Sequence, residues 1–291
     1  MDLEGQRTQG QIDPRYEDIT QDGRVRIDAF PVGFGLVWRQ IRVSPQIRHA
    51  LRENGIIPIL TRFELEGLPG PFAVERAIEV EGGYTLSRSE DEAGRVTRLF
   101  LDMDVELWGS KGRTNLPPPD DAGARALVGR AWAEHTFTRP FAPPSDRKVI
   151  ALPVDGKDFV PTARRAWKPP RAAMDLPFGA RALEPALTED PVSTAFGLSH
   201  TDSNQHVNSL VYPRLFEEAS LRRLAALGRD TTVLARRLDI AYRRPSFAGE
   251  KVKVALRAFE LEGRLVCTGA FFGEGESDVE RARVYAQMTF E

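Results

Sequence analysis

The chain has 291 residues, of which 41% are hydrophobic, and this content indicates a globular core rather than a disordered chain. Its net charge of −2 gives no electrostatic basis for a general nucleic-acid-binding protein, and the single cysteine, Cys267, excludes an internal disulfide framework. The amino-terminal segment is polar and acidic and no apolar run approaches membrane-spanning length, so we expect a cytoplasmic protein.

The N-terminal half is predicted to contain a strand, a helix and then further strands. The segment from Arg24 to Trp38 is strand-like. A compact helix is expected after it, with Ser44 as N-cap, Pro45 at the first helical position and Gly55 as terminator. Strand-like segments follow at Ile59 to Glu66, Phe72 to Arg88, Val96 to Gly109 and Leu127 to Thr138.

Prolines concentrate in the middle of the chain. Nine of the 21 lie between Pro140 and Pro185, where they are incompatible with long regular elements. This composition predicts a long connection across a surface that contains a domain boundary. An irregular excursion within a single domain is the alternative.

The C-terminal half has clearer signals. A short strand is expected from Pro191 to Ser199, and a helix from Pro213 to Leu227 that ends at Gly228. Glu262-Gly263 predicts a tight hairpin between two of the strands after the helix. Those four strand-like segments are Ala235 to Arg244, Glu250 to Leu261, Arg264 to Gly273 and Arg281 to Phe290.

Both halves therefore run from a strand through a helix to several strands. This order indicates an internal structural duplication, although the two copies do not align in sequence. The predicted class is α+β, with a helix lying on an antiparallel sheet.

One stretch gathers more reactive groups than any other. Asp202, Asn204 and His206 form a D-x-N-x-H pattern at the predicted entry to the C-terminal helix. In acyl chemistry a carboxylate can act as general base on water or as direct nucleophile, and Asp202 is the candidate. Asn204 can hold the carboxylate or a water, and His206 can donate a hydrogen bond, orient Asp202 or shuttle a proton. Backbone N–H groups around 207–209 are candidates for stabilising an oxyanion.

The pattern D-x-N-x-H-V-N-x-x-x-Y, followed by Phe216-Glu217-Glu218-Ala219, resembles the hotdog-fold thioesterases. It is most similar to acyl-carrier-protein (ACP) thioesterases with two hotdog domains in one chain. The resemblance implies a tandem (double) hotdog, each a long central helix packed on an antiparallel sheet. It implies an N-terminal hotdog at 1–145 that forms the acyl pocket, a proline-rich connection at 146–185 and a catalytic C-terminal hotdog at 186–291.

Glu217 is a candidate supporting acid, because helical spacing places it with Leu221 and Leu224 on the stripe expected to face the sheet. A role confined to a local hydrogen-bond network is the alternative for Glu217. Glu218 is expected to form a surface ion pair with Arg222. The catalytic candidates are therefore Asp202, Asn204, His206 and Glu217, and the substrate-binding candidates are Val207, Asn208, Ser209 and Tyr212.

Two positions depart from the pattern of the resembled enzymes. Plant-type members carry Glu-Cys after a Tyr-Arg-Arg segment, whereas here Tyr242-Arg243-Arg244 is followed by Pro245-Ser246. Ser209 stands where they have a second asparagine. A cysteine nucleophile is thus excluded at that place, and the chemistry must rest on the Asp-Asn-His set or be altered.

The first hypothesis is therefore a thioesterase of fatty-acid or polyketide metabolism that releases a free acid from acyl-ACP or acyl-CoA. The alternatives are an acyltransferase or dehydratase acting on acyl thioesters, and a non-catalytic acyl-binding protein. No cofactor is expected, and a metal site at His200, Asp202 and His206 is disfavoured because a fourth ligand is missing. A homodimer stays open. His135 and Cys267 are expected to be ordinary packing residues.

Overall fold

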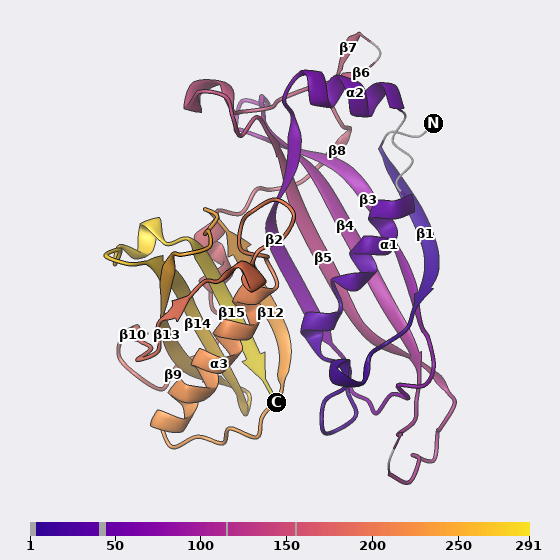
Figure 1. Ribbon diagram of the computed structural model, residues 1–291, viewed down its shortest axis with the longest axis vertical. Coiled ribbons are helices and arrows are strands. Elements are labelled where there is room, and N and C mark those ends of the chain that lie inside the picture. Colours follow the sequence, from indigo (N-terminus) through magenta and orange to yellow (C-terminus); the bar gives the residue numbers. More distant parts are fainter. Residues whose placement is uncertain (1–3, 41–44, 115, 155) are drawn as a thin grey trace. The chain divides into compact units, whose positions relative to one another are not determined.

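The computed structural model describes residues 4–40, 45–114, 116–154 and 156–291. The chain divides into two compact units (Figure 1). The N-terminal unit comprises Met1–Val25, Ala29–Thr61 and Leu68–Lys168, and the C-terminal unit comprises Arg26–Asp28, Arg62–Gly67 and Pro169–Glu291. None of the described helices is both long and apolar enough to cross a bilayer.

The N-terminal unit is built on an antiparallel sheet in the order β1-β3-β4-β5. Alternate residues of β4 are buried, among them Leu101, Met103 and Val105, because successive side chains of a strand point to opposite faces. The strands are β1 (Gly5–Ile12), β2 (Ile57–Gly67), β3 (Ile78–Glu90), β4 (Val96–Ser110) and β5 (Arg125–Thr138). The strands predicted at 59–66, 96–109 and 127–138 are confirmed, and the one predicted from Phe72 begins only at Ile78.

Short elements complete this unit. The proline-rich segment supplies a two-stranded ladder and a short strand, β8, that pairs in parallel with β3. These elements are η1 (Tyr16–Asp18), η3 (Pro144–Asp146), β6 (Leu152–Val154), β7 (Lys157–Phe159) and β8 (Ala163–Arg164).

Helix α1 (Val32–Gln40) lies on one face of this sheet (Figure 1). The strand predicted over 24–38 is therefore wrong. A Cβ on Gly33 would lie 3.3 Å from Val105 Cγ2, and one on Gly82 of β3 would lie 2.6 Å from Val105 Cγ1. The two glycines thus allow the helix to approach the sheet closely, and this packing buries Val37.

Helix α2 (Pro45–Glu53) confirms the compact helix predicted from its proline and glycine. Gly55 has a φ of +62°, the left-handed conformation that ends helices and that glycine adopts without a steric penalty. The predicted N-cap, Ser44, lies outside the described residues.

The sheet of the C-terminal unit has the order β12-β15-β14-β13, all antiparallel, and residues 62–66 of β2 pair with β12. The four predicted strands are confirmed, although the last begins at Val284 rather than Arg281. Glu262 and Gly263, with φ of 50° and 80°, form the predicted hairpin turn. The strands are β12 (Ala235–Tyr242), β13 (Lys251–Leu261), β14 (Arg264–Gly273) and β15 (Val284–Phe290).

The edge of this sheet at β13 is covered by short segments that precede the helix. The strand predicted over 191–199 is reduced to two residues, β11 (Thr194–Ala195), which pair with β13. The remaining short elements are η2 (Ile27–Ala29), η4 (Pro170–Met174), β9 (Arg181–Ala182), β10 (Thr188–Glu189), η5 (Leu198–His200) and η6 (Val279–Arg281).

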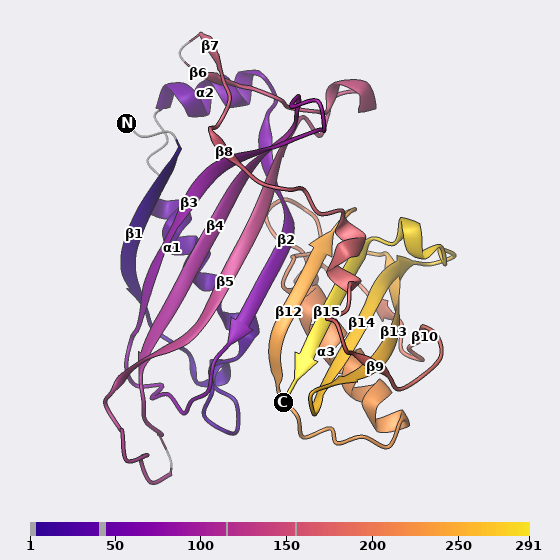
Figure 2. The same ribbon diagram turned by 180° about the vertical axis from the view of Figure 1, so that it is seen from behind.

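Helix α3 (Val211–Ala226) lies across one face of the C-terminal sheet, and Figure 2 shows the opposite face. The helix buries Tyr212, Phe216 and Leu224, and Gly228 beyond its end has a φ of +65°. On the opposite face Ala173 of η4 packs into a cluster that includes Tyr285. Both faces of the sheet are thus covered, which gives this unit a core of its own.

Candidate active site

The D-x-N-x-H residues form a tight loop between η5 and α3. A bridge pairs Thr201 with Val207. Inside it the Asp202 N–H donates to the His206 carbonyl at 3.1 Å, and the Gln205 N–H donates to the Asp202 carbonyl at 3.0 Å. Gln205 has a φ of 67°, a left-handed conformation that lets the chain reverse within few residues. The motif is thus one closed turn.

Asp202 is half-buried, and its carboxylate is engaged on one side only. Oδ1 accepts the Asn204 N–H at 2.8 Å, the hydrogen bond of an Asx turn. Across the described residues no hydrogen bond joins the side chains of Asp202, Asn204 and His206, and Oδ2 accepts none. Asn204 therefore orients the carboxylate through its backbone rather than its side chain, and Oδ2 is available to a water or a substrate.

The imidazole of His206 packs against Phe247, which lies beyond β12. The two rings meet edge to face, with centroids 5.8 Å apart and planes at 74°. His206 is half-buried and Phe247 is 46% exposed. Phe247 therefore restricts the orientation of the ring while leaving the pair accessible to solvent.

Of the backbone N–H groups predicted to face an oxyanion, two have protein acceptors. The Val207 N–H donates to the Ser246 carbonyl and the Asn208 N–H to the His200 carbonyl, each at 2.8 Å. The Ser209 N–H makes no hydrogen bond to any described residue. Of these three backbone N–H groups, that of Ser209 is thus the one able to donate a hydrogen bond to a substrate.

Tyr212 lies in the core beneath the loop, being only 2% exposed. Its ring packs edge to face against Phe196, Tyr242 and Phe271, with centroid distances of 5.9, 5.9 and 5.2 Å. Burial raises its pKa above the usual value of a tyrosine. The Tyr242 hydroxyl donates to the Ser209 carbonyl at 2.9 Å. Both tyrosines therefore support the loop from inside the unit.

Glu217 lies beside the buried stripe of α3 rather than on it. Phe216 and Leu224 are fully buried, whereas the Glu217 side chain is 24% exposed. The predicted pair of Glu218 and Arg222 is confirmed, with Nη1 and Oε2 3.7 Å apart. In the described part of the chain no hydrogen bond or ion pair connects Glu217 with the motif loop.

A small charge cluster surrounds Glu217. Arg26 Nη2 lies 3.4 Å from Glu217 Oε2, and Arg26 Nε also donates to the buried Asp28 at 3.0 Å. Arg214, one turn earlier on α3, donates to the other oxygen of Asp28 at 2.8 Å. Burial raises the pKa of the Glu217 carboxyl. The nearby carboxylates of Asp28 and Glu218 raise it further, whereas the guanidinium groups of Arg26 and Arg214 lower it. Protonation of Glu217 thus depends on Arg26, a residue remote in sequence.

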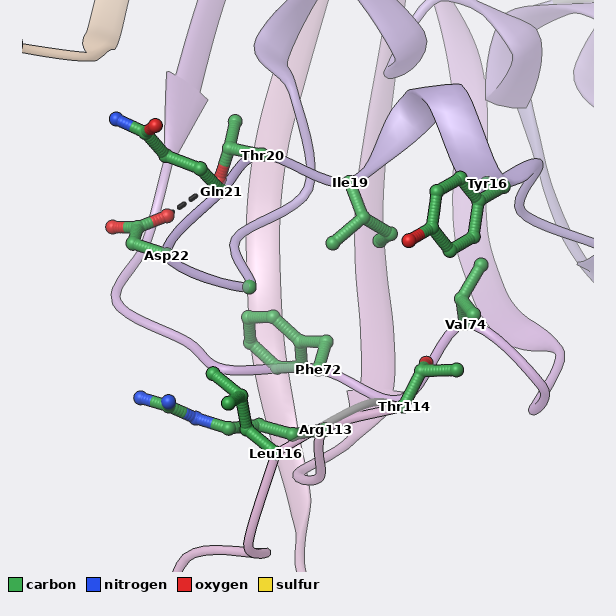
Figure 3. A pocket seen from close by; sticks show the side chains of 11 residues that line it. Tyr16, Ile19, Thr20, Gln21, Asp22, Phe72, Val74, Arg113, Thr114 and Leu116 are labelled. Carbon is green, nitrogen blue, oxygen red and sulfur yellow. Dashed lines mark hydrogen bonds between the residues drawn. The ribbon is translucent and has the colours of Figure 1, made fainter.

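A separate pocket of about 270 Å³ opens in the N-terminal unit (Figure 3). Its apolar wall includes Ile19, Phe72 and Val74, and Tyr16 and Arg113 add polar groups. None of the predicted site residues lines this pocket.

A family comparison matches the segment that contains the loop. Residues 204–272 match the model of the thioesterase superfamily. This span begins inside the D-x-N-x-H motif and runs through α3 to the end of β14. This segment of the chain is therefore similar to the thioesterase superfamily.

Solved thioesterase structures share the fold of this chain over nearly its full length. An acyl-ACP thioesterase from Bacteroides thetaiotaomicron is 14% identical, with 98% of each chain covered and a TM-score of 0.57. A 12:0-ACP thioesterase from Umbellularia californica is 12% identical, with 99% of this chain and 94% of that one covered and a TM-score of 0.55. A protein from Lactobacillus plantarum with the provisional name oleoyl thioesterase is 10% identical, with 99% and 95% covered and a TM-score of 0.60. Comparison with curated protein sequences finds no match.

Sequence reasoning did not select three residues that contact the predicted site. Ser246 and Phe247 contact the motif loop, and Arg26 contacts Glu217. Ser246 carried a signal, because it stands where the sequence departs from the resembled pattern. Neither Phe247 nor Arg26 lies in a motif, so their roles depend on tertiary contacts.

Proposed function

We propose that the chain hydrolyses an acyl thioester, carried by ACP or coenzyme A, to a free acid and a thiol. The observation that supports this most directly is the Asp202 carboxylate, with one oxygen fixed by the Asn204 N–H and the other unengaged by the described protein. Such a group can take a proton from an attacking water or attack the carbonyl itself.

In the general-base route, Asp202 removes a proton from water as the water oxygen attacks the thioester carbon. The Ser209 N–H stabilises the developing oxyanion, since it has no described acceptor of its own. The C–S bond then breaks, and the proton that Asp202 took from water passes to the leaving thiolate, with His206 as the relay. The products are one carboxylic acid and one thiol, and no further reactant is needed.

We also propose that each unit is one hotdog of a tandem pair, joined by the connection at 146–185. Each unit has a helix on an antiparallel sheet, α1 in the first and α3 in the second. In this proposal the N-terminal hotdog, at 1–145, binds the acyl chain and the C-terminal hotdog, at 186–291, performs the hydrolysis.

Thiol release from a panel of acyl-CoA and acyl-ACP substrates tests the proposed reaction. We expect release without any added acceptor, in equal amount with free acid. Release that requires an acceptor alcohol or amine indicates an acyltransferase instead. Binding of acyl thioesters with no release above the uncatalysed rate contradicts hydrolysis and indicates a binding protein.

Glu217→Gln is expected to lower kcat/KM about tenfold near neutral pH, within the range of general acid–base contributions. Because burial raises the pKa of Glu217, its carboxylate is lost early as the pH falls. The acidic limb of the kcat/KM profile should therefore move to lower pH in the variant. Glu189→Gln is the matched control, since it removes an exposed carboxylate of the same unit that pairs with Lys253. An unchanged acidic limb in Glu217→Gln contradicts the role.

Ile19→Trp is expected to shift the preferred substrate to a shorter acyl chain, because the larger side chain fills part of the N-terminal pocket. Rates with the shortest substrates should stay within about twofold of the wild type, and rates with long chains should fall about tenfold, the order of effect that a pocket changed by one or two methylenes produces. Ile57→Trp is the control, since Ile57 is 41% exposed in the same unit and does not line the pocket. The same length profile in Ile19→Trp as in the wild type would mean that this pocket does not bind the acyl chain.

A further inference from the structure

Two consecutive residues of the motif loop are held by two consecutive residues of one remote segment. The Val207 N–H donates to the Ser246 carbonyl at 2.8 Å, and the His206 ring packs on the Phe247 ring. Residues 245–250 lie between β12 and β13 and contain no regular element of their own. The position of the loop therefore depends on how this segment is fixed.

The segment is fixed by Arg283, the residue before β15. Arg283 Nη1 donates to Ser246 Oγ at 3.2 Å and also to the Glu250 carboxylate. Glu250 Oε2 in turn accepts the Phe247 N–H at 2.9 Å. Arg283 thus reaches both residues that contact the motif, Ser246 directly and Phe247 through Glu250.

The surroundings of Arg283 suit a fixed guanidinium. The side chain is 14% exposed, and Glu276 accepts from its Nε and Nη2 at 3.4 Å. Ser246 is fully buried. Gly273 lies against the guanidinium, since a Cβ there would be 2.3 Å from Nη2. The planar fork of arginine can serve all these acceptors at once, whereas the point charge of lysine cannot.

We propose that Arg283 is a positioning residue that sets the motif loop through Ser246 and Phe247. This inference rests on the proposed thioester hydrolysis at that loop. Small displacements matter at such a site, because an error of about 1 Å in a reacting group can cost about a hundredfold in rate. The Pro245-Ser246 departure then has a structural meaning: the buried Ser246 hydroxyl accepts from Arg283 and the Ser246 carbonyl accepts from Val207.

Two variants test the proposal by different routes. Arg283→Met removes the donors, and Gly273→Ala keeps the arginine but displaces its guanidinium with a new methyl group. We expect kcat for a medium-chain acyl-CoA to fall at least tenfold in both, with KM within about twofold, since the loop rather than the chain-binding pocket is disturbed. Arg283→Lys should recover part of the loss. Arg264→Met is the control, because it removes an exposed arginine that pairs with Glu291 in the same unit.

The imidazole signals of His206 in NMR spectra give a readout that does not depend on catalysis. They should shift in Gly273→Ala and in Arg283→Met and stay in place in Arg264→Met, while thermal unfolding of Gly273→Ala stays near that of the wild type. If Arg283→Met fails to fold, Gly273→Ala decides alone. Unchanged kcat together with unchanged His206 signals in Gly273→Ala overturns the proposal. Shifted signals in a protein whose wild type releases no thiol would overturn the proposed function and leave the positioning role standing.

Discussion

Asp202→Asn is expected to lower kcat for thioester hydrolysis by about a thousandfold, within the range that general-base catalysis contributes. Asparagine preserves the shape of the side chain, and its oxygen can still accept the Asn204 N–H that holds Oδ1 at 2.8 Å. The loop should therefore keep its fold while losing the group that accepts a proton or attacks the carbonyl. Steady-state thiol release, with circular dichroism to verify folding, measures the effect.

Asp230→Asn is the matched control for that experiment. Asp230 makes the same type of turn, accepting the Thr232 N–H at 2.8 Å, and is exposed in the same unit. Its replacement should leave kcat within about twofold, since exposed substitutions away from a site have small effects. Residual activity of Asp202→Asn within tenfold of the wild type would remove Asp202 from the chemistry.

The two roles open to Asp202 can be separated in water labelled with heavy oxygen. A nucleophilic carboxylate forms an anhydride, and if water attacks that anhydride at the Asp202 carbon, the labelled oxygen stays on the protein after a single turnover. A general base incorporates label only into the released acid. Label on the peptide that contains Asp202 after one turnover, measured by mass spectrometry, therefore identifies the nucleophilic route.

The C-terminal strands were predictable because their signals are local. Alternation over 251–259 marks a strand with one buried face, and Glu262-Gly263 supplies the left-handed residues that a two-residue hairpin needs. Helix α3 was equally predictable, since Gly228 lies just beyond its end, as the sequence indicated. In each case neighbouring residues carry the information.

The failed strand prediction over 24–38 has the opposite cause. Gly33 and Gly35 weaken a helix, and the valines and aromatic residues around them favour a strand. The segment is helical in α1 because Gly33 permits close packing on the sheet and Val37 is buried there. That contribution comes from strands more than forty positions away in the sequence, and no local pattern contains it.

In the candidate site, too, the contacts between neighbouring residues were predictable and those between distant residues were not. The turn around Asp202 is closed by its own neighbours, so the motif alone indicated it. Which N–H groups remain available was not predictable, because the acceptor of the Val207 N–H is the distant Ser246. Arg26 and Glu217 are 191 positions apart in the sequence, so the residues around each of them do not indicate their contact.

Acidification is expected to destabilise the N-terminal unit through His135. This residue is 8% exposed, its ring meets Trp38 edge to face at 5.4 Å, and Nδ1 lies 3.3 Å from the Leu101 carbonyl. Burial lowers its pKa from 6.5 to about 4. The unfolded chain therefore takes up a proton near pH 6.5 while the folded chain stays neutral, so stability is lost as the pH falls from about 6.5 to about 4. Below that range both states are protonated and His135 adds no further loss.

The size of this effect follows from the linkage of protonation to folding. Between pH 7.5 and 4.5 the His135 contribution is about 2–3 kcal/mol of unfolding free energy. His135→Phe keeps an aromatic ring against Trp38 and cannot titrate, so its stability should fall less over the same range by about that amount. All four tryptophans lie in the N-terminal unit, so their fluorescence during urea unfolding reports on that unit. His49→Gln, at an exposed histidine, should behave like the wild type. Parallel pH dependence of the wild type and His135→Phe would show that His135 is not held neutral by its burial.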